Sequence, residues 1–191
     1  MIALSSILIA HGFKRRTVIS IICIVIVLAI VCLLSYLVIL FTNLSGMSDE
    51  VSFYLSEGLG GIDMRGIIAG GIIIATLGVL DDIITAQVAV IDELKKAKPT
   101  MMMRELYTSG SSVGGEHIAS LVNTLALAYA GASLPLVLHL VNNSTNSSML
   151  LFNGEYIATE IVRTLVASAG LVLAVPVSTL IAAYIYDRLI K

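Results

Sequence analysis

The sequence predicts an all-α integral membrane protein with four full transmembrane helices, a partial N-terminal helix and a short surface helix on the cytoplasmic side. The 191 residues are 58% hydrophobic and only 13% charged, and the mean hydropathy is +1.00. A soluble domain is about half apolar and about a quarter charged. Four apolar runs are long enough to cross a bilayer. We therefore expect residues 1–191 to form a single transmembrane domain.

The N-terminal half supplies a short apolar segment and two spans. Residues 1–10, MIALSSILIA, make a helix only ~15 Å long, too short to cross, so we expect a partial or interfacial helix. Residues 17–42 contain no charge and form the first span. Residues 66–91 form the second span, which is interrupted by the adjacent acids Asp81 and Asp82.

The C-terminal half supplies the surface helix and two further spans. After Pro99, Thr100 is a plausible N-cap, and mixed apolar and basic residues over about 100–109 predict a short amphipathic surface helix. The third span covers residues 118–141 and the fourth covers 157–186. A proline lies inside each of these two spans, where it removes a backbone hydrogen bond and favours a kink.

The basic residues predict how the spans are oriented. With four alternating spans, nine of the eleven Lys and Arg residues fall on one side, and only Arg65 and Arg163 fall on the other. Cytoplasmic loops collect Lys and Arg. The sequence therefore predicts a multi-pass membrane protein whose C-terminus is cytoplasmic.

The acid pair in the second span is the strongest functional signal. A charge at the centre of a span costs about 3 kcal/mol on insertion scales, so acids there face other helices or water. Counting by threes and fours from Asp82 gives a stripe of small residues, which let helices approach closely. This stripe, expected to be the packed face, consists of Gly71, Ala75, Gly78, Asp82, Ala86 and Ala89.

Depth along the spans places other polar side chains near the acids. Thr85, Gln87, Asn123 and Thr124 are expected to form one polar cluster with Asp81 and Asp82. Two adjacent carboxyl groups in low dielectric do not both ionise, so the pair can hold and release a proton near neutral pH. This is the chemistry of a proton relay. The alternative is a pair of protonated, hydrogen-bonded acids that join helices.

A second charged pair lies near the start of the fourth span. Glu160 and Arg163 are one turn apart and can pair on their own helix. One interpretation is an interfacial pair that reaches the headgroups. The other is that Arg163 turns inward as a counter-charge for the acids.

Several classes of function are disfavoured. The net charge of −2 gives no indication of nucleic-acid binding. Cys23 and Cys32 are nine residues apart on one span, too far for a disulfide. An intramembrane metalloprotease needs H-E-x-x-H, which is absent. We expect no enzymatic activity, no metal and no cofactor, and the expected partners are the lipid bilayer and other membrane proteins.

Ordered blocks along the chain resemble a known family. The blocks AHGFKRRT, LGVLDD, DELKKAKP, RELY, HIASLVNTLALAYAGASLPL and EIVRTLVASAGLVLAVP are similar to the YibE/F family of bacterial multi-pass membrane proteins. The resemblance implies a bacterial plasma-membrane protein, and the activity of the family is undefined. Longer members carry an upstream span and an extracytoplasmic segment, which this chain is expected to lack.

A weaker resemblance concerns the order of the elements. Acids in a span, a charged helix exit, a short surface helix and two further spans are similar to the resistance-nodulation-division transporters and to SecD/SecF. In many drug-efflux members a pair of aspartates in the corresponding span forms the proton relay. In this chain, only Asp81 and Asp82 correspond to functional residues of those transporters. Four spans are less than half of such a transporter, so a homo-oligomer or a paralogous membrane partner is expected.

Two functions follow from the sequence. The first is a proton-coupled transporter or export component that uses Asp81 and Asp82. The second is a non-catalytic membrane scaffold or assembly partner. Asparagine at the two positions distinguishes them, because it keeps the hydrogen bonding that a scaffold needs and removes the proton that transport needs.

Overall fold

The computed structural model describes residues 14–47, 54, 58, 62–135, 138, 141 and 154–189. Within these residues it contains four helices and no β-strand, which confirms the all-α class. The helices are α2 (Arg15–Thr42), α4 (Met64–Ala97), α5 (Met103–Ala132) and α8 (Glu155–Leu189). The partial helix expected at residues 1–10 lies outside the described residues.

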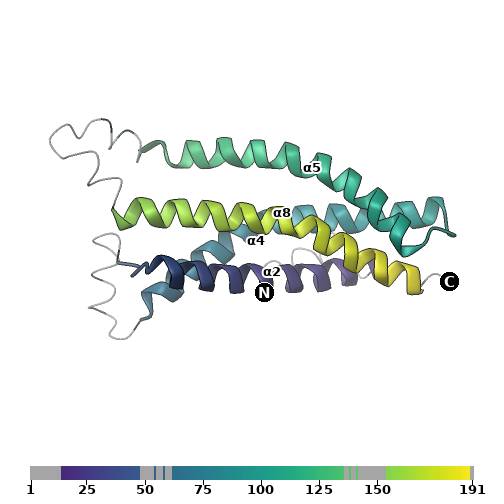
Figure 1. Cartoon of the computed structure of the whole chain (residues 1–191), viewed down its shortest axis with the longest axis horizontal. Helices are drawn as coiled ribbons and strands as arrows, with labels where there is room; N and C mark the ends of the chain where they lie inside the picture. Colours follow the sequence, from purple (N-terminus) through teal and green to yellow (C-terminus); the bar gives the residue numbers. More distant parts are fainter. Residues whose placement is uncertain are drawn as a thin grey trace.

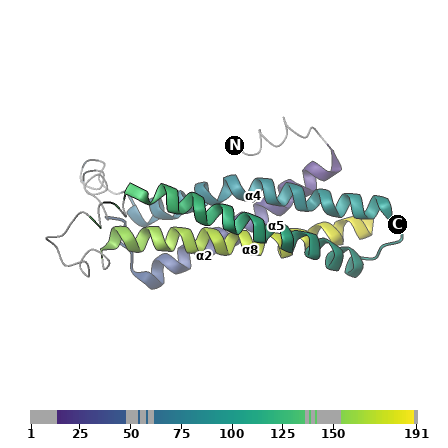
Figure 2. The same ribbon diagram turned by 90° about the horizontal axis from the view of Figure 1, so that it is seen from above.

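The four helices run side by side and alternate in direction (Figures 1 and 2). Helix α8 contacts each of the other three, α2 contacts α4 and α8, and α5 contacts α8 and α4. We call the end where α2 and α5 begin and α4 and α8 finish the basic end, because it carries Lys14, Lys95, Lys98, Arg104 and Arg188. The opposite end is called the loop end.

Three helices of the described part of the chain are long and apolar enough to cross a membrane. They are α2, α4 and α8, so the protein is embedded in a membrane. Helix α5 has 30 residues, but it is not one of the three. Much of the predicted span 118–141 lies after Ala132, where the structure describes only some residues. The predicted count of four full spans therefore stays a prediction.

The separate surface helix expected over about 100–109 is not observed. Lys98 is the C-cap of α4, and α5 begins at Met103 and continues without a break to Ala132. Thr100 lies in the turn and is not the N-cap, which is Met102. The Met102 backbone N–H donates to the Glu105 carboxylate at 3.3 Å. The mixed apolar and basic pattern therefore belongs to the first turns of a long helix.

Helix α8 forms the centre of the bundle and contains a proline. Pro176 lies inside the helix, and Figure 1 shows α8 bending in the yellow part that leads to the C-terminus. Small residues on this helix are buried, since Ala167 and Ala174 are at most 5% exposed. A Cβ on Gly170 would lie 2.7 Å from Val31. Helices α2 and α8 therefore pack closely at this level.

Candidate functional site

The two aspartates of α4 differ in burial. Asp81 is half-buried, and its Oδ1 atom is buried. Asp82 is exposed on the outer surface of the chain. The Thr85 hydroxyl donates to the backbone oxygens of both residues, at 2.8 Å for Asp81 and 3.2 Å for Asp82. The side chains of the pair therefore have two different environments.

The prediction that the small-residue stripe of α4 is its packed face is wrong within this chain. Ala75, Gly78 and Asp82 are exposed, and Gly71, Ala86 and Ala89 are only partly buried. A Cβ on Gly70, Gly71 or Gly78 would meet no atom within 4 Å. The buried face consists instead of larger side chains, including Ile72, Leu80, Ile84, Gln87, Val88 and Ile91. Large apolar side chains fill the space between α4 and its neighbours, which leaves the small residues outside.

The expected polar cluster is only partly assembled. The Thr85 hydroxyl donates a hydrogen bond to the backbone of its own helix, at the Asp81 oxygen. Asn123 and Thr124 are exposed on α5. Thr124 also bonds its own helix, at the Ser120 oxygen. Gln87 points to a different set of partners. The depth estimate erred because α5 begins at Met103 and so places Asn123 and Thr124 further toward the loop end.

Gln87 joins three helices at a buried point. Its side chain is 2% exposed. Its amide nitrogen donates to the Gly110 oxygen of α5 at 2.8 Å and to the Thr179 hydroxyl of α8 at 2.7 Å. Thr179 in turn donates to the Val175 oxygen at 2.6 Å. Both donors of the amide are thereby satisfied, as a buried polar group requires. We call Gln87, Gly110 and Thr179 the three-helix node.

Glycines on α5 make this close approach possible. A Cβ on Gly110 would lie 2.4 Å from the Ile91 side chain, and one on Gly114 would lie 2.4 Å from Val175 and 2.8 Å from the Gln87 oxygen. The two glycines are four residues apart, which is the spacing of close helix contacts in membranes. The stretch GSSVG at residues 110–114 is the sequence signal from which this packing could have been predicted.

Three contacts between α4 and α8 show how deep the other ionisable groups lie along the bundle. Gly170 lies by Thr76, Thr179 bonds Gln87 and Asp187 lies by Lys95. Asp81 and Asp82 are therefore level with the residues of α8 just before Pro176. On α5, His117 lies about 21 Å along the helix from Met103, and its side chain is exposed. His117 is therefore well inside the bundle length and not at the basic end.

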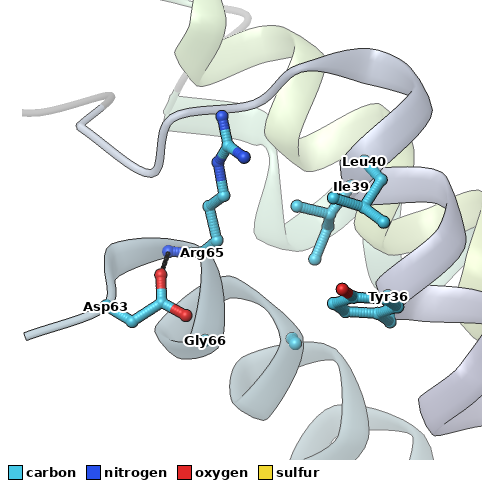
Figure 3. Close-up of a pocket in the computed structure, with 7 residues that line it drawn as sticks. Tyr36, Ile39, Leu40, Asp63, Arg65 and Gly66 are labelled. Atoms are coloured by element: carbon cyan, nitrogen blue, oxygen red, sulfur yellow. Dashed lines mark hydrogen bonds between the residues drawn. The ribbon is translucent and has the colours of Figure 1, made fainter.

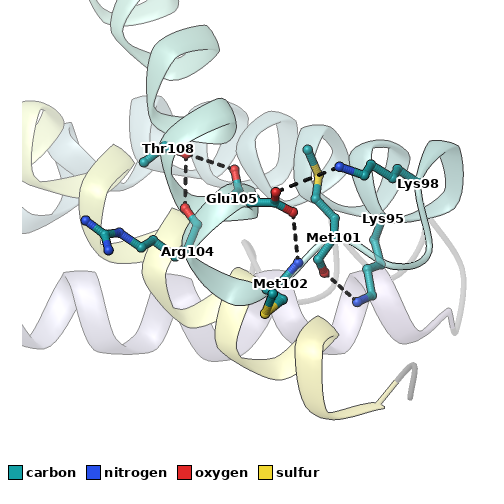
Figure 4. Close-up of polar contacts among 7 residues, drawn as sticks. All are labelled: Lys95, Lys98, Met101, Met102, Arg104, Glu105 and Thr108. Carbon is teal, nitrogen blue, oxygen red and sulfur yellow. Dashed lines mark hydrogen bonds and ion pairs between the residues drawn. The ribbon is translucent and has the colours of Figure 1, made fainter.

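A buried lysine organises the basic end. Lys95 is 3% exposed, its ammonium donates to the Met101 oxygen at 2.8 Å, and Asp187 of α8 lies 3.7 Å away. Figure 4 shows Lys95 reaching the turn that precedes α5, while Lys98 lies near Glu105 at 3.8 Å. Lys95 therefore holds α4, α8 and the start of α5 together.

The pair Glu160 and Arg163 forms as predicted on its own helix. The Arg163 guanidinium and the Glu160 carboxylate are 2.6 Å apart, and both side chains are about one third exposed. By the register of α8 against α4, Arg163 lies near Gly70, about three turns from Asp81. This position fits the interfacial interpretation, and the counter-charge role stays a prediction.

Glu155 ties the loop end together. Its carboxylate accepts hydrogen bonds from the Ser45 backbone at 2.5 Å, the Gly46 backbone at 2.7 Å and the Ser45 hydroxyl at 2.7 Å. Gly46 has φ of 83°, and a Cβ there would lie 2.6 Å from the Met64 oxygen. The turn after α2 is thus held by the start of α8 and packed on the start of α4.

Replacing Glu155 with glutamine is expected to loosen this end of the bundle. Hydrogen bonds to a charged acceptor contribute about 1.5–3 kcal/mol, and the amide keeps only part of that stabilisation. We expect the protein to unfold earlier on heating in detergent and the 43–47 turn to be cleaved faster by protease. The control is Glu105→Gln on the exposed start of α5, and equal loss in both variants would contradict the special role of Glu155.

No metal site is indicated by the residues that the structure describes. Among them, no group of three or more His, Cys, Asp or Glu side chains is arranged to hold a metal ion. Cys23 is buried and lies 3.9 Å from the Ser178 oxygen, whereas Cys32 is exposed. The described chemistry of the site is thus that of carboxyl, amide and hydroxyl groups.

Comparison with known proteins gives one result. No curated protein and no solved structure matches the chain. The family model described as YibE/F-like protein matches residues 1–188 of the 191. Because the match covers nearly the whole sequence, acid pair and three-helix node included, the chain belongs to the YibE/F-like protein family.

Proposed function

We propose that this protein is a proton-coupled transporter or export component of the bacterial plasma membrane, with Asp81 as the group that binds and releases the proton. The observation that carries the proposal is the half-buried carboxyl of Asp81, whose Oδ1 is buried in the middle of a membrane-spanning helix. Ionisable groups at such depth are rare in spans and mark ion or proton pathways.

A line of polar groups leads from Asp81 toward the basic end. Thr85 lies four residues after Asp81, and Asp92 lies seven residues after Thr85, which places all three on one side of α4. The carboxylate of Asp92 is 15% exposed and bonds Lys96 at 2.7 Å. These groups support proton exchange between Asp81 and the basic end. That end is proposed to be cytoplasmic because it holds most of the basic residues.

Solute profiling of vesicles tests this function even though the substrate is unidentified. Vesicles containing the wild-type protein, Asp81→Asn or Asp82→Asn are given a pH gradient, and the solutes they lose or gain are identified by mass spectrometry. We expect at least one solute to move with the wild type, to stop when a protonophore removes the gradient, and to stop with Asp81→Asn. Identical profiles for correctly folded wild type and Asp81→Asn would contradict transport and favour a scaffold.

The exposed stripe of α4 is proposed to pack against the same stripe of a second copy. An ionised carboxylate that faces lipid at the centre of a span costs about 3 kcal/mol, and Asp82 is exposed there. Copies inserted in the same direction form a two-fold contact, which places like residues together. Gly78 permits a close crossing, and the contact would remove the two Asp82 side chains, one turn away, from the surrounding lipid. Asp82 would then act in assembly and Asp81 in proton exchange.

Cysteine cross-linking measures this contact. In a Cys32→Ser background, Gly78→Cys is expected to give a disulfide-linked dimer on mild oxidation in membranes, because Cα atoms at a small-residue crossing come within disulfide range. Val172→Cys is the control, since Val172 is 49% exposed at nearly the same depth on α8. The proposed contact would be contradicted if Gly78→Cys gave no disulfide-linked dimer, or if Gly78→Cys and Val172→Cys gave the same dimer yield.

A further inference from the structure

A pocket of about 290 Å³ lies between α2 and α4 at the loop end. One wall comes from Tyr36, Ile39 and Leu40 near the end of α2. The other comes from Asp63, Arg65 and Ala69 at the start of α4. Figure 3 shows the Tyr36 ring across the pocket from Asp63 and Gly66, with Arg65 at its upper edge. The pocket therefore has an apolar wall and a wall that carries two opposite charges.

The side chains of Asp63 and Arg65 do not form an ion pair with each other. One oxygen of Asp63 accepts from the Arg65 backbone N–H at 3.1 Å and caps α4. Figure 3 shows the Arg65 side chain extending away from that carboxylate. Among the described residues, Arg65 forms no ion pair, whereas Arg163, the other arginine at this end, is paired with Glu160. The pocket thus offers a cation and a carboxylate oxygen at separate points.

The position of the pocket corresponds to the headgroup region of a bilayer. It lies where a membrane-spanning helix ends at Thr42 and the next begins at Met64. Tyr36 is about 9 Å inside that end of α2, and tyrosine favours the membrane interface. Tyr36 and Leu40 are 59% and 42% exposed, and Phe41 beside them is 84% exposed. The apolar wall is therefore open to surrounding lipid.

From this arrangement we propose that the pocket binds a phospholipid whose headgroup carries a phosphodiester and a primary ammonium, as in phosphatidylethanolamine. The Arg65 guanidinium contacts the phosphate, for which arginine is well suited. The second oxygen of Asp63 accepts from the ammonium, and the Tyr36 hydroxyl lies within the pocket as a further donor. Ile39, Leu40 and Ala69 contact the glycerol and the first carbons of the acyl chains.

The two charges of the pocket favour one lipid headgroup over the others. A phosphatidylglycerol headgroup satisfies Arg65 but brings no cation to Asp63. A phosphatidylcholine headgroup brings a cation without N–H donors, and that cation is bulkier. Only the ethanolamine headgroup of these three supplies both a hydrogen-bonding cation and an anion to a pocket that holds one of each. This site is independent of the acid pair, because it lies at the start of α4, whereas Asp81 and Asp82 lie in the middle of that helix.

Lipid binding to the purified full chain tests the proposal. The protein is released from detergent in a mass spectrometer after addition of phosphatidylethanolamine, phosphatidylcholine, phosphatidylglycerol or inorganic phosphate, and retained ligands are counted. We expect phosphatidylethanolamine to bind about fivefold more tightly than the other two lipids, the size of one partly exposed ion pair. Inorganic phosphate alone is expected to compete weakly.

Three variants assign the contacts. Asp63→Asn keeps the helix cap, because asparagine also caps helices, but is expected to remove the preference for phosphatidylethanolamine. Arg65→Gln is expected to weaken binding of all three lipids, and Ala69→Leu is expected to exclude them by filling the pocket. The control is Lys98→Gln at the basic end. Equal binding of the three lipids to the wild type, an unchanged preference in Asp63→Asn, or competition by inorganic phosphate as strong as by lipid would overturn the proposal.

Discussion

Replacing Asp81 with asparagine is expected to abolish labelling of the protein by a hydrophobic carbodiimide. Such reagents react with protonated carboxyl groups in apolar surroundings, and Asp81 has a buried carboxyl oxygen in the middle of α4. The proposed function requires Asp81 to hold a proton during part of its cycle, and the protonated carboxyl is the form that reacts. Mass spectrometry of the peptide that contains both aspartates measures the labelling.

The remaining acids supply the controls for this experiment. Glu105 is 49% exposed and lies near Lys98, so it is not in apolar surroundings and should stay unlabelled, and Glu105→Gln should change nothing. Asp82→Asn reports whether the neighbouring acid contributes. Labelling of the peptide that persists at the wild-type level in Asp81→Asn would show that the reactive carboxyl is Asp82, and the roles assigned to the two residues would then have to be exchanged.

Replacing Gly114 with leucine is expected to have the largest effect on folding. A single Cβ at this position would lie 2.4 Å from Val175 and 2.8 Å from the Gln87 oxygen. Overpacking of a tight core costs about 1–3 kcal/mol, and more where backbones must separate. The change also displaces Gln87 from Thr179 and Gly110, so a buried amide loses its partners. We expect markedly lower thermal stability in detergent and weak accumulation in membranes.

The adjacent glycine provides a matched control. A Cβ on Gly115 would meet no atom within 4 Å, so Gly115→Leu makes the same chemical change on the same helix without the clash. We expect near-native stability for that variant. If Gly114→Leu and Gly115→Leu were equally stable, α5 would not pack against α8 and α4 through the three-helix node.

The sequence predicted those elements that depend on apolar length. The first span was predicted as 17–42 and the second as 66–91, and α2 and α4 contain these ranges. Helix α8 likewise contains the predicted range 157–186. Runs of apolar residues can be recognised without information on their neighbours, because the bilayer alone requires a length of about 20 residues.

Packing faces could not be predicted in the same way. On α8, the small residues Ala167, Gly170 and Ala174 are buried. On α4, small residues at similar spacing are turned outward, and Ile and Leu side chains make the contacts. The same pattern thus has two outcomes, since a small residue permits a close approach without specifying which helix approaches. The identity of the neighbour is a property of the assembled bundle.

The candidate site shows the same limit. Asp81 is identifiable from sequence because an acid in an apolar run is conspicuous, whereas the partners predicted for Gln87 were wrong. Its contacts with Thr179 and Gly110 join positions 92 and 23 residues away in the chain. The contacts of Glu155 and Lys95 were not predicted, because a charged residue at a helix end suggests a side chain in solvent. Only the folded chain shows that backbone groups surround these two side chains.

The most direct measurement of the central claim is an infrared titration of the protein in lipid. A protonated carboxyl in an apolar environment gives a C=O stretching band that disappears when the proton leaves. The account predicts that the wild type shows this band and loses it as the pH is raised, that the band is absent in Asp81→Asn, and that it is unchanged in Glu160→Gln. A spectrum with no such band, or with a band that Asp81→Asn leaves intact, would contradict proton binding by Asp81.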